Sequence, residues 1–298
     1  MLLHVRTLRT LLQALFLCWL LLASQAWAGK LPLWELEGGS NRILMLGSIH
    51  YLRPSDYPLP AAFDEALDAA DLVVMELDMD SLDPLSSMMV LETLGREPGK
   101  TLKDQIGASR YNEVSSRAGS VGIDMRLLDD KKAWYAAVLV SQVRLLQMGF
   151  DPSWGIEARF TAGAVAAGKP IIGLETLEGQ LGTMDRMSVD TQADFLIESL
   201  NDQEAAEEEM QTIVRAWKSG ETGEMESVML EGFDEMPELY QSLLVSRNRS
   251  WVSQLKSLDK RHSNKTILII VGGMHLVGKD SVQSMLKPYG YSSKQLSE

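Results

Sequence analysis

Two segments of the chain share one layout: RILMLGSIH at residues 42–50 and TILIIVGGMH at residues 266–275. Each is a short apolar run that ends in a Gly-x-x-His motif. Continuous apolar runs of this length are typical of strands whose two faces are both covered, as in a parallel sheet flanked by helices. The two segments therefore predict two buried strands and an α/β fold class.

The neighbouring residues predict the elements that surround these strands. Residues 59–70 carry apolar side chains at helical spacing, and residues 71–77 (DLVVMEL) form another apolar run, so residues 42–77 predict a strand–helix–strand unit with parallel strands. We expect a mixed, largely parallel sheet flanked by helices, with a helical region at about residues 188–260. The other expected elements are strands at 122–128 and 170–174, the latter buried, and helices at 130–148, 155–167 and 237–258.

The N-terminal residues 1–28 have the pattern of a secretory signal. Basic Arg6 and Arg9 precede an apolar run, and Ala26-Trp27-Ala28 fits a small-x-small cleavage site. The run of about 13 residues is shorter than the ~20 that span a bilayer, although an uncleaved anchor is the alternative. We therefore expect an exported bacterial protein, periplasmic or secreted, with no stable membrane insertion after cleavage and one α/β domain over residues 29–298.

Charge and cysteine content exclude several kinds of function. The chain has 41 Asp and Glu against 28 Lys and Arg, a net charge of −13, and such a field repels nucleic acid and anionic lipid. The single cysteine, Cys18, lies in the predicted signal, so no disulfide, thiolate ligand or cysteine nucleophile is expected afterwards. The chain contains no HExxH, GxSxG or GxxxxGK[ST] motif. The expected chemistry therefore depends on histidines and carboxylates.

Histidines and acidic residues follow several of the predicted strands. His50 and His275 end the two GxxH motifs, and Glu76 and Glu175 follow two further apolar runs. Because the carboxyl ends of parallel strands line the ligand crevice of an open sheet, we expect these side chains at one rim. Two imidazoles and a carboxylate suit Zn, Mn, Co or Fe(II), and a bound ion lowers the pKa of its water. His50, His275 and Glu76 are therefore the expected metal ligands.

Other polar residues have structural alternatives. Glu76 precedes Asp78 and Asp80 and could belong to a solvated loop, and Glu175 could cap the following helix. His262 lies in the polar stretch LDKRHSNK and is expected on the surface. Arg247, Asn248 and Arg249 interrupt an apolar helix, so we expect one of the two arginines to face solvent and the other to reach inward, to a substrate carboxylate or to Glu76.

Four segments, in order along the chain, resemble the TraB/PrgY/GumN family, which includes the TIKI metalloproteases. They are residues 44–78, 155–188, 243–251 and 271–291. The resemblance implies a fold of the erythromycin-esterase/ChaN-like class. It places the family's paired GxxH motifs on His50 and His275, and its strand-end Glu on Glu76. Its LET/Q motif falls on Glu175 and Gln180, and its RN motif falls on Arg247 and Asn248. Many members have Asp in a Gly-aliphatic-Asp motif where this chain has Glu157.

The resemblance also implies a function, because TIKI-type members are metal-dependent peptidases that use Mn or Co. We expect an exported metal-dependent hydrolase that acts on a peptide or small-molecule substrate, with Mn or Co favoured and Zn or Fe possible. Glu76 and Glu175 would be catalytic carboxylates, and Arg247 and Asn248 would orient the substrate or stabilise the oxyanion. Two non-catalytic alternatives stay open: a haem-binding protein, for which Tyr51 beside His50 could ligate iron, and a peptide-binding regulator.

Overall fold

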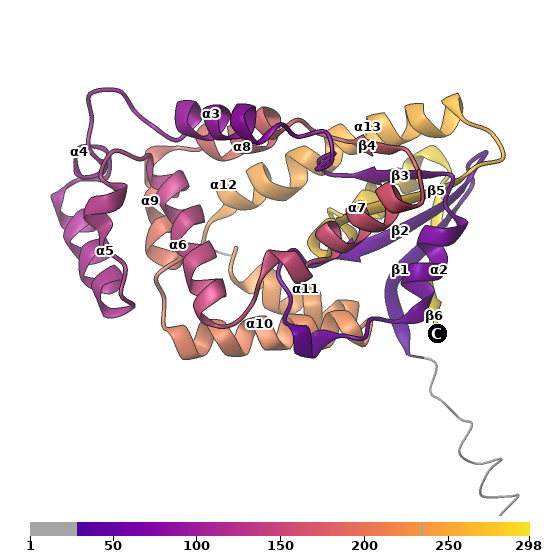
Figure 1. The fold of residues 1–298 in the computed structure, drawn as a ribbon, viewed down its shortest axis with the longest axis horizontal. Helices are drawn as coiled ribbons and strands as arrows, with labels where there is room; N and C mark the ends of the chain where they lie inside the picture. Colours follow the sequence, from indigo (N-terminus) through magenta and orange to yellow (C-terminus); the bar gives the residue numbers. More distant parts are fainter. Residues whose placement is uncertain (1–28, 234) are drawn as a thin grey trace, which may run out of the picture.

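The computed structural model describes residues 29–233 and 235–298. The predicted signal at residues 1–28 lies outside the described residues. Figure 1 shows a sheet on one side of the molecule and a group of helices, α4, α5, α6 and α9, on the other. The mixed sheet of six strands is flanked by helices, which confirms the predicted α/β class. Within the described ranges, no helix is both long enough and apolar enough to cross a membrane.

The sheet has the strand order β4-β3-β5-β2-β1-β6. The pairs β2–β5, β5–β3 and β3–β4 are parallel, whereas β1 pairs antiparallel with both β2 and β6. β2 and β3 are parallel, as predicted, but β5 lies between them. The strands are β1 (Lys30–Glu37), β2 (Arg42–Ser48), β3 (Leu72–Met75), β4 (Ile171–Gly173), β5 (Thr266–Gly272) and β6 (Ser292–Ser297).

Helices make up most of the rest of the described chain. The first group is α2 (Ala61–Ala69), α3 (Pro84–Leu94), α4 (Leu102–Ile106), α5 (Ala108–Ser120), α6 (Ala133–Gln147), α7 (Ile156–Ala166) and α8 (Leu177–Asp185). The second is α9 (Val189–Glu198), α10 (Gln203–Lys218), α11 (Thr222–Glu231), α12 (Pro237–Tyr240), α13 (Ser246–Arg261) and α14 (Val282–Leu286). Short 3-10 turns are η1 (Pro54–Asp56), η2 (Met125–Leu128), η3 (Pro152–Trp154), η5 (Gly273–Leu276) and η6 (Lys287–Tyr289), and a π-helical turn, η4 (Gln241–Val245), joins α12 to α13.

Both faces of the central strands are buried, which explains their continuous apolar runs. Along β2, Leu44 and Leu46 pack on one face, with side chains of α2, α7 and α10. Ile43 and Met45 pack on the other face, with side chains of α13 and α14. Each fully buried Leu or Ile contributes about 1.5–3 kcal/mol of transfer free energy, so two covered faces favour this arrangement strongly. Helices α4, α5, α6 and α9 bury a separate apolar cluster of their own.

Two of the predicted strands differ from the structure. The prediction at 122–128 was wrong: residues Met125–Leu128 form the 3-10 turn η2, Asp124 accepts a hydrogen bond from the Arg126 amide, and Leu127 is 78% exposed. The segment 170–174 does contain a strand, but β4 lies at the sheet edge and Ile172 is exposed, so its predicted burial was wrong. The strands β1 and β6 were not predicted.

Asp259 joins three segments that are distant in sequence. This buried α13 side chain accepts hydrogen bonds from the Ser40 amide, the Asn41 side chain (2.7 Å) and the Tyr291 hydroxyl (2.8 Å). It thereby connects the β1–β2 turn, α13 and the residues before β6. Burial by itself raises the pKa of Asp259, but the hydrogen bonds from these donors outweigh it. The net effect lowers the pKa, so the carboxylate stays charged.

We predict that Asp259→Ala lowers the free energy of unfolding by about 3 kcal/mol, because it leaves several buried donors unpaired. Urea denaturation followed by circular dichroism measures the change. Asp64→Ala is the matched control, since Asp64 forms an exposed ion pair with Arg159 and should cost less than about 1 kcal/mol. Equal losses in the two variants would contradict the role given to Asp259.

Candidate functional site

The register of three parallel strands brings the predicted site residues to one rim of the sheet. Ser48 of β2 lies opposite Gly272 of β5, and Met75 of β3 lies opposite Ile270. β2 and β5 therefore end at the same level, with the two GxxH motifs offset by one residue, and Glu76 follows β3 on the other side of β5. The turns also touch, because a Cβ atom at Gly47 would lie 3.1 Å from the Gly273 Cα.

Helices of the 188–260 region pack directly against both turns. Trp217 of α10 donates its indole N–H to the Gly47 carbonyl over 2.7 Å. Met225 of α11 packs on the second turn, where its Cε atom would lie 2.9 Å from a Cβ atom at Gly273. Both helical side chains are buried, so α10 and α11 support the two turns from within the core.

Three of the expected site residues surround Gly272. A Cβ atom at Gly272 would lie 3.3 Å from Glu76 Oε1, 3.4 Å from His275 Cδ2 and 3.8 Å from His50 Nε2. Strand ends that are distant in sequence thus bring two imidazoles and a carboxylate together. Within residues 29–233 and 235–298, however, no three His, Cys, Asp or Glu side chains already form a group that could hold a metal ion.

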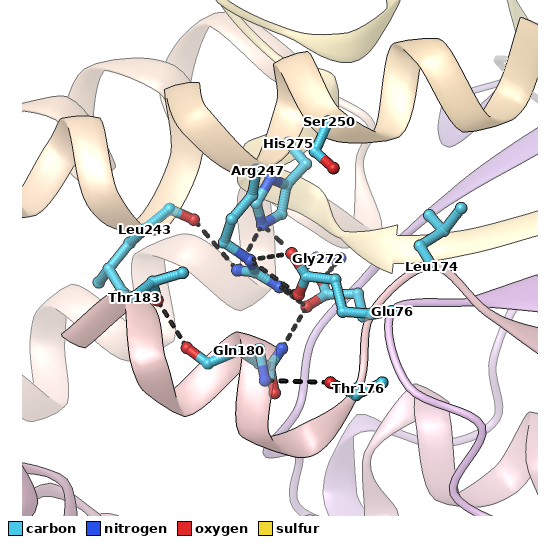
Figure 2. A network of polar contacts seen from close by, with 12 residues as sticks. Glu76, Leu174, Thr176, Gln180, Thr183, Leu243, Arg247, Ser250, Gly272 and His275 are labelled. Carbon is cyan, nitrogen blue, oxygen red and sulfur yellow. Dashed lines mark hydrogen bonds and ion pairs between the residues drawn. The ribbon is translucent and has the colours of Figure 1, made fainter. Parts of the chain in front are cut away.

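The Arg247 guanidinium lies between His275 and Glu76 (Figure 2). Its Nη1 is 3.2 Å from His275 Nε2 and donates to the Leu243 carbonyl over 3.1 Å. Its Nη2 donates to Glu76 Oε2 over 2.5 Å, and its Nε and Nη2 donate to Glu175 over 3.0 Å and 2.8 Å. All five N–H groups of the guanidinium are therefore engaged within the protein. Of the two arginines in this stretch, Arg247 is the one that reaches inward, to Glu76, whereas Arg249 is exposed.

Glu76 is a buried and ionised carboxylate. Its Oε1 accepts the Gly272 amide over 2.8 Å, and its Oε2 accepts the Gln180 side chain over 3.0 Å, as Figure 2 shows. Burial opposes ionisation, but the neighbouring His275, Arg247 and His50 side chains and the Gly272 amide lower the pKa of Glu76 to about 2. At neutral pH the cations beside Glu76 are Arg247 and the protonated His50, because His275 is neutral there.

His275 is the buried histidine of the pair. Its Nδ1 lies 2.6 Å from Asn248 Oδ1, an acceptor, so Nδ1 carries the proton and Nε2 has a free lone pair. Burial lowers the pKa of His275 to about 3, despite the attraction of Glu76. The Asn248 amide also donates to the Asp280 carbonyl, and Asn248 is 1% exposed. Asn248 therefore orients His275, which differs from the expectation that it contacts a substrate.

His50 is the exposed histidine, with 57% of its side chain accessible. Its Nδ1 lies 2.8 Å from Glu157 Oε1, and this carboxylate raises the pKa of His50 to about 9, so the ring is protonated at neutral pH. The Ser48 hydroxyl donates to the same Glu157 oxygen. His262 follows α13, at the opposite end of β5 from His275, and makes none of these contacts.

Sequence reasoning missed the roles of Ser48 and Glu157. The signal for Ser48 was present in the sequence, because it is a polar residue at the end of an apolar run. In the structure it is the last residue of β2 and is 3% exposed. Glu157 stands in the first turn of α7, where an acidic residue is also favoured by the helix dipole, so sequence alone offered a structural explanation. The contact between them depends on tertiary packing.

We predict that the His50–Glu157 ion pair stabilises the fold at low pH and ceases to do so at high pH. The folded pKa of about 9 exceeds the ordinary 6.5, so the contribution is complete below pH 6.5 and is lost as the pH rises through 9. The difference in free energy of unfolding between the wild type and His50→Gln should shrink over this range in urea titrations. His262→Gln should show no such trend, and a pH-independent difference for His50→Gln would refute the prediction.

Comparison with known proteins places the chain in a family. It is 22% identical over 250 residues to the Uncharacterized protein YbaP of Escherichia coli (strain K12). The aligned segment covers 84% of this chain and 89% of that protein. The protein of the same name from Shigella flexneri matches to the same extent. No solved structure matches the chain. The TraB/PrgY/gumN family model matches residues 32–295, a range that includes all four motif segments and confirms the resemblance: the chain belongs to the TraB/PrgY/gumN family.

Proposed function

We propose that this chain is a metal-dependent hydrolase whose ion is bound by His50, His275 and Glu76. One observation carries the proposal: both imidazoles have Nδ1 engaged by a protein oxygen, from Glu157 for His50 and from Asn248 for His275. A metal-ligating histidine almost always gives its other ring nitrogen to such an acceptor. The Nε2 atoms are therefore the ones that an ion would use, and on His50 it would displace the proton that Nε2 carries at neutral pH. Both rings adjoin Gly272 together with Glu76.

The donor set fits a divalent ion in kind. Two imidazole nitrogens and one carboxylate oxygen suit Mn, Co, Zn or Fe(II), and three protein ligands leave a position open for a reactant. Mn or Co is favoured by the resemblance to TIKI-type members. The proposal requires Arg247 to release His275 Nε2, and Glu175 already accepts two of the N–H groups that would keep the guanidinium in place. An ion would then provide the positive charge that Arg247 now provides to Glu76.

The surrounding residues have distinct parts in the proposed hydrolysis. An ion bound there would act as a Lewis acid toward a substrate carbonyl and would activate water. Arg247, once its Nη1 leaves His275, would donate an N–H to the oxygen that becomes negative during the reaction. Glu175 would hold the guanidinium through its ion pair and would be the general base of the proposed reaction. Asn248 would keep His275 in the tautomer that presents Nε2.

The proposed substrate class is a peptide bond, on the strength of the resemblance to TIKI-type peptidases. Export is part of the same proposal and rests on the pattern of residues 1–28. Haem binding fits less well, because charged groups surround His275 whereas ligand pockets for large cofactors are mostly apolar. Peptide binding without turnover is one outcome of the hydrolysis test below.

We predict that the wild type binds Mn(II) or Co(II) stoichiometrically and that His50→Ala and His275→Ala each weaken this affinity by a factor on the order of 100. Equilibrium dialysis followed by elemental analysis measures the binding. His262→Ala is the matched control, because His262 lies at the far end of β5, and it should bind as the wild type does. If both site variants keep the parental affinity, the ligand assignment is wrong.

Hydrolysis is tested with the same proteins. The metal-loaded wild type, incubated with a peptide library and read by mass spectrometry, should cleave a subset of peptides, and Glu76→Gln should abolish the cleavage. Selective binding without cleavage in the presence of either metal would favour the regulator and contradict the enzyme.

We also predict that Gly272→Ala folds normally but lowers metal affinity and any hydrolysis about tenfold or more, since small misplacements of reacting groups are costly. Its φ of −47° suits alanine, but the methyl would stand 3.3 Å from Glu76 Oε1, among all three proposed ligands. Gly119→Ala in α5 is the control, because nothing lies within 4 Å of its Cβ position. Unchanged metal affinity in Gly272→Ala would contradict the location of the site.

A further inference from the structure

The two GxxH histidines are fixed in different ways. His275 is buried, packs at a tilted angle against Trp251 with 4.3 Å between ring centroids, and bonds to Asn248. His50 has 57% of its side chain exposed, and its ring bonds to Glu157. An exposed imidazole can change rotamer easily unless a partner restrains it. The orientation of His50 therefore depends on Glu157 far more than the orientation of His275 depends on any single contact.

The N-terminus of α7 places Glu157 against the first GxxH turn. The Ile156 amide donates to the Ile49 carbonyl over 3.1 Å. At the preceding position there is no room for a side chain, because a Cβ atom at Gly155 would lie 2.1 Å from the His50 carbonyl oxygen. The close backbone approach explains why a glycine stands two residues before the acidic residue. Main-chain contacts thus set the distance between Glu157 and the His50 ring.

Ser48 fixes the carboxylate from the other side. Its hydroxyl donates to Glu157 Oε1, the oxygen that also contacts His50 Nδ1. The corresponding position of the second motif is Gly273, which has no hydroxyl, and there the Asn248 amide restrains the histidine instead. Within the described part of the chain, Glu157 Oε2 is buried and has no hydrogen-bond partner. A buried unpaired oxygen costs stability, so this arrangement is better explained by an effect on His50 than by stability.

We propose that Ser48 and Glu157 are positioning residues that set the orientation of the His50 ring and act on the reaction only through it. The side-chain length matters: Glu157 spans the distance from α7 to Nδ1, whereas an aspartate on the same backbone would withdraw the carboxylate from the ring. The idea that His50 Nε2 faces a metal ion rests on the proposed function. The orientation of the ring can be measured without metal.

The first experiment is nuclear magnetic resonance of the imidazole nitrogens in the metal-free protein. The chain has four histidines and the predicted signal contains one of them, so the spectrum is simple, and His50→Gln assigns the relevant signals. We expect Glu157→Gln and Glu157→Asp to shift or broaden the His50 signals, Ser48→Ala to do so less, and His275 to be unaffected. Glu238→Gln, which disrupts a comparable carboxylate that accepts from Ser188 and Thr191, should change nothing. Unchanged His50 signals in folded Glu157→Gln and Glu157→Asp would overturn the proposal.

The second experiment uses Co(II) as the probe. Both Glu157 variants should bind Co(II) about 10–100-fold more weakly than the wild type and should alter its visible absorption spectrum, as loss of an outer-shell partner does. Parental affinity and spectrum in both variants would overturn the positioning role. If the wild type itself binds no Co(II), the proposed metal site fails, and the nitrogen signals still decide the inference about His50.

Discussion

The parallel pairing of β5 with β2 on one side and β3 on the other determines where every residue of the candidate site lies. The register Ser48–Gly272 and Met75–Ile270 makes β2 and β5 end level and β3 end two residues earlier, at the same rim. A shift by one residue would turn each side chain to the opposite face and bury the wrong set, so two apolar cores hold the register. The convergence of His50, Glu76 and His275 is therefore a consequence of core packing rather than of local turn structure.

Charge balance is the second constraint on the site. Glu76, Glu175 and Arg247 are all largely buried, and a buried ion pair rarely stabilises a fold more than apolar residues of the same shape would. Such a cluster is costly to keep unless something depends on it. Arg247 neutralises Glu76 in the metal-free protein, and a divalent ion would do the same with His275 and His50 as its other ligands. The proposed metal-bound state would differ from this structure mainly in which cation Glu76 faces.

Much of this could be predicted from the sequence, since the informative signals were local. Apolar runs located β2, β3 and β5, and strand-end positions identified His50, His275 and Glu76. Edge strands carry weaker signals, and β6 (SSKQLS) has no apolar run. The opposite error occurred at residues 122–128, which are apolar enough to resemble a strand but form a 3-10 turn at 125–128. The roles of Glu157 and Asn248 depend on how α7 and α13 dock, which local patterns do not encode.

Anomalous X-ray diffraction from crystals of the Co(II)-loaded protein tests the proposed metal site most directly. We expect one strong anomalous peak at about 2.0–2.2 Å from His50 Nε2, His275 Nε2 and a Glu76 oxygen, with Arg247 withdrawn from His275 toward Glu175. A peak elsewhere, or none, with the guanidinium still against His275, would contradict the proposed metal site.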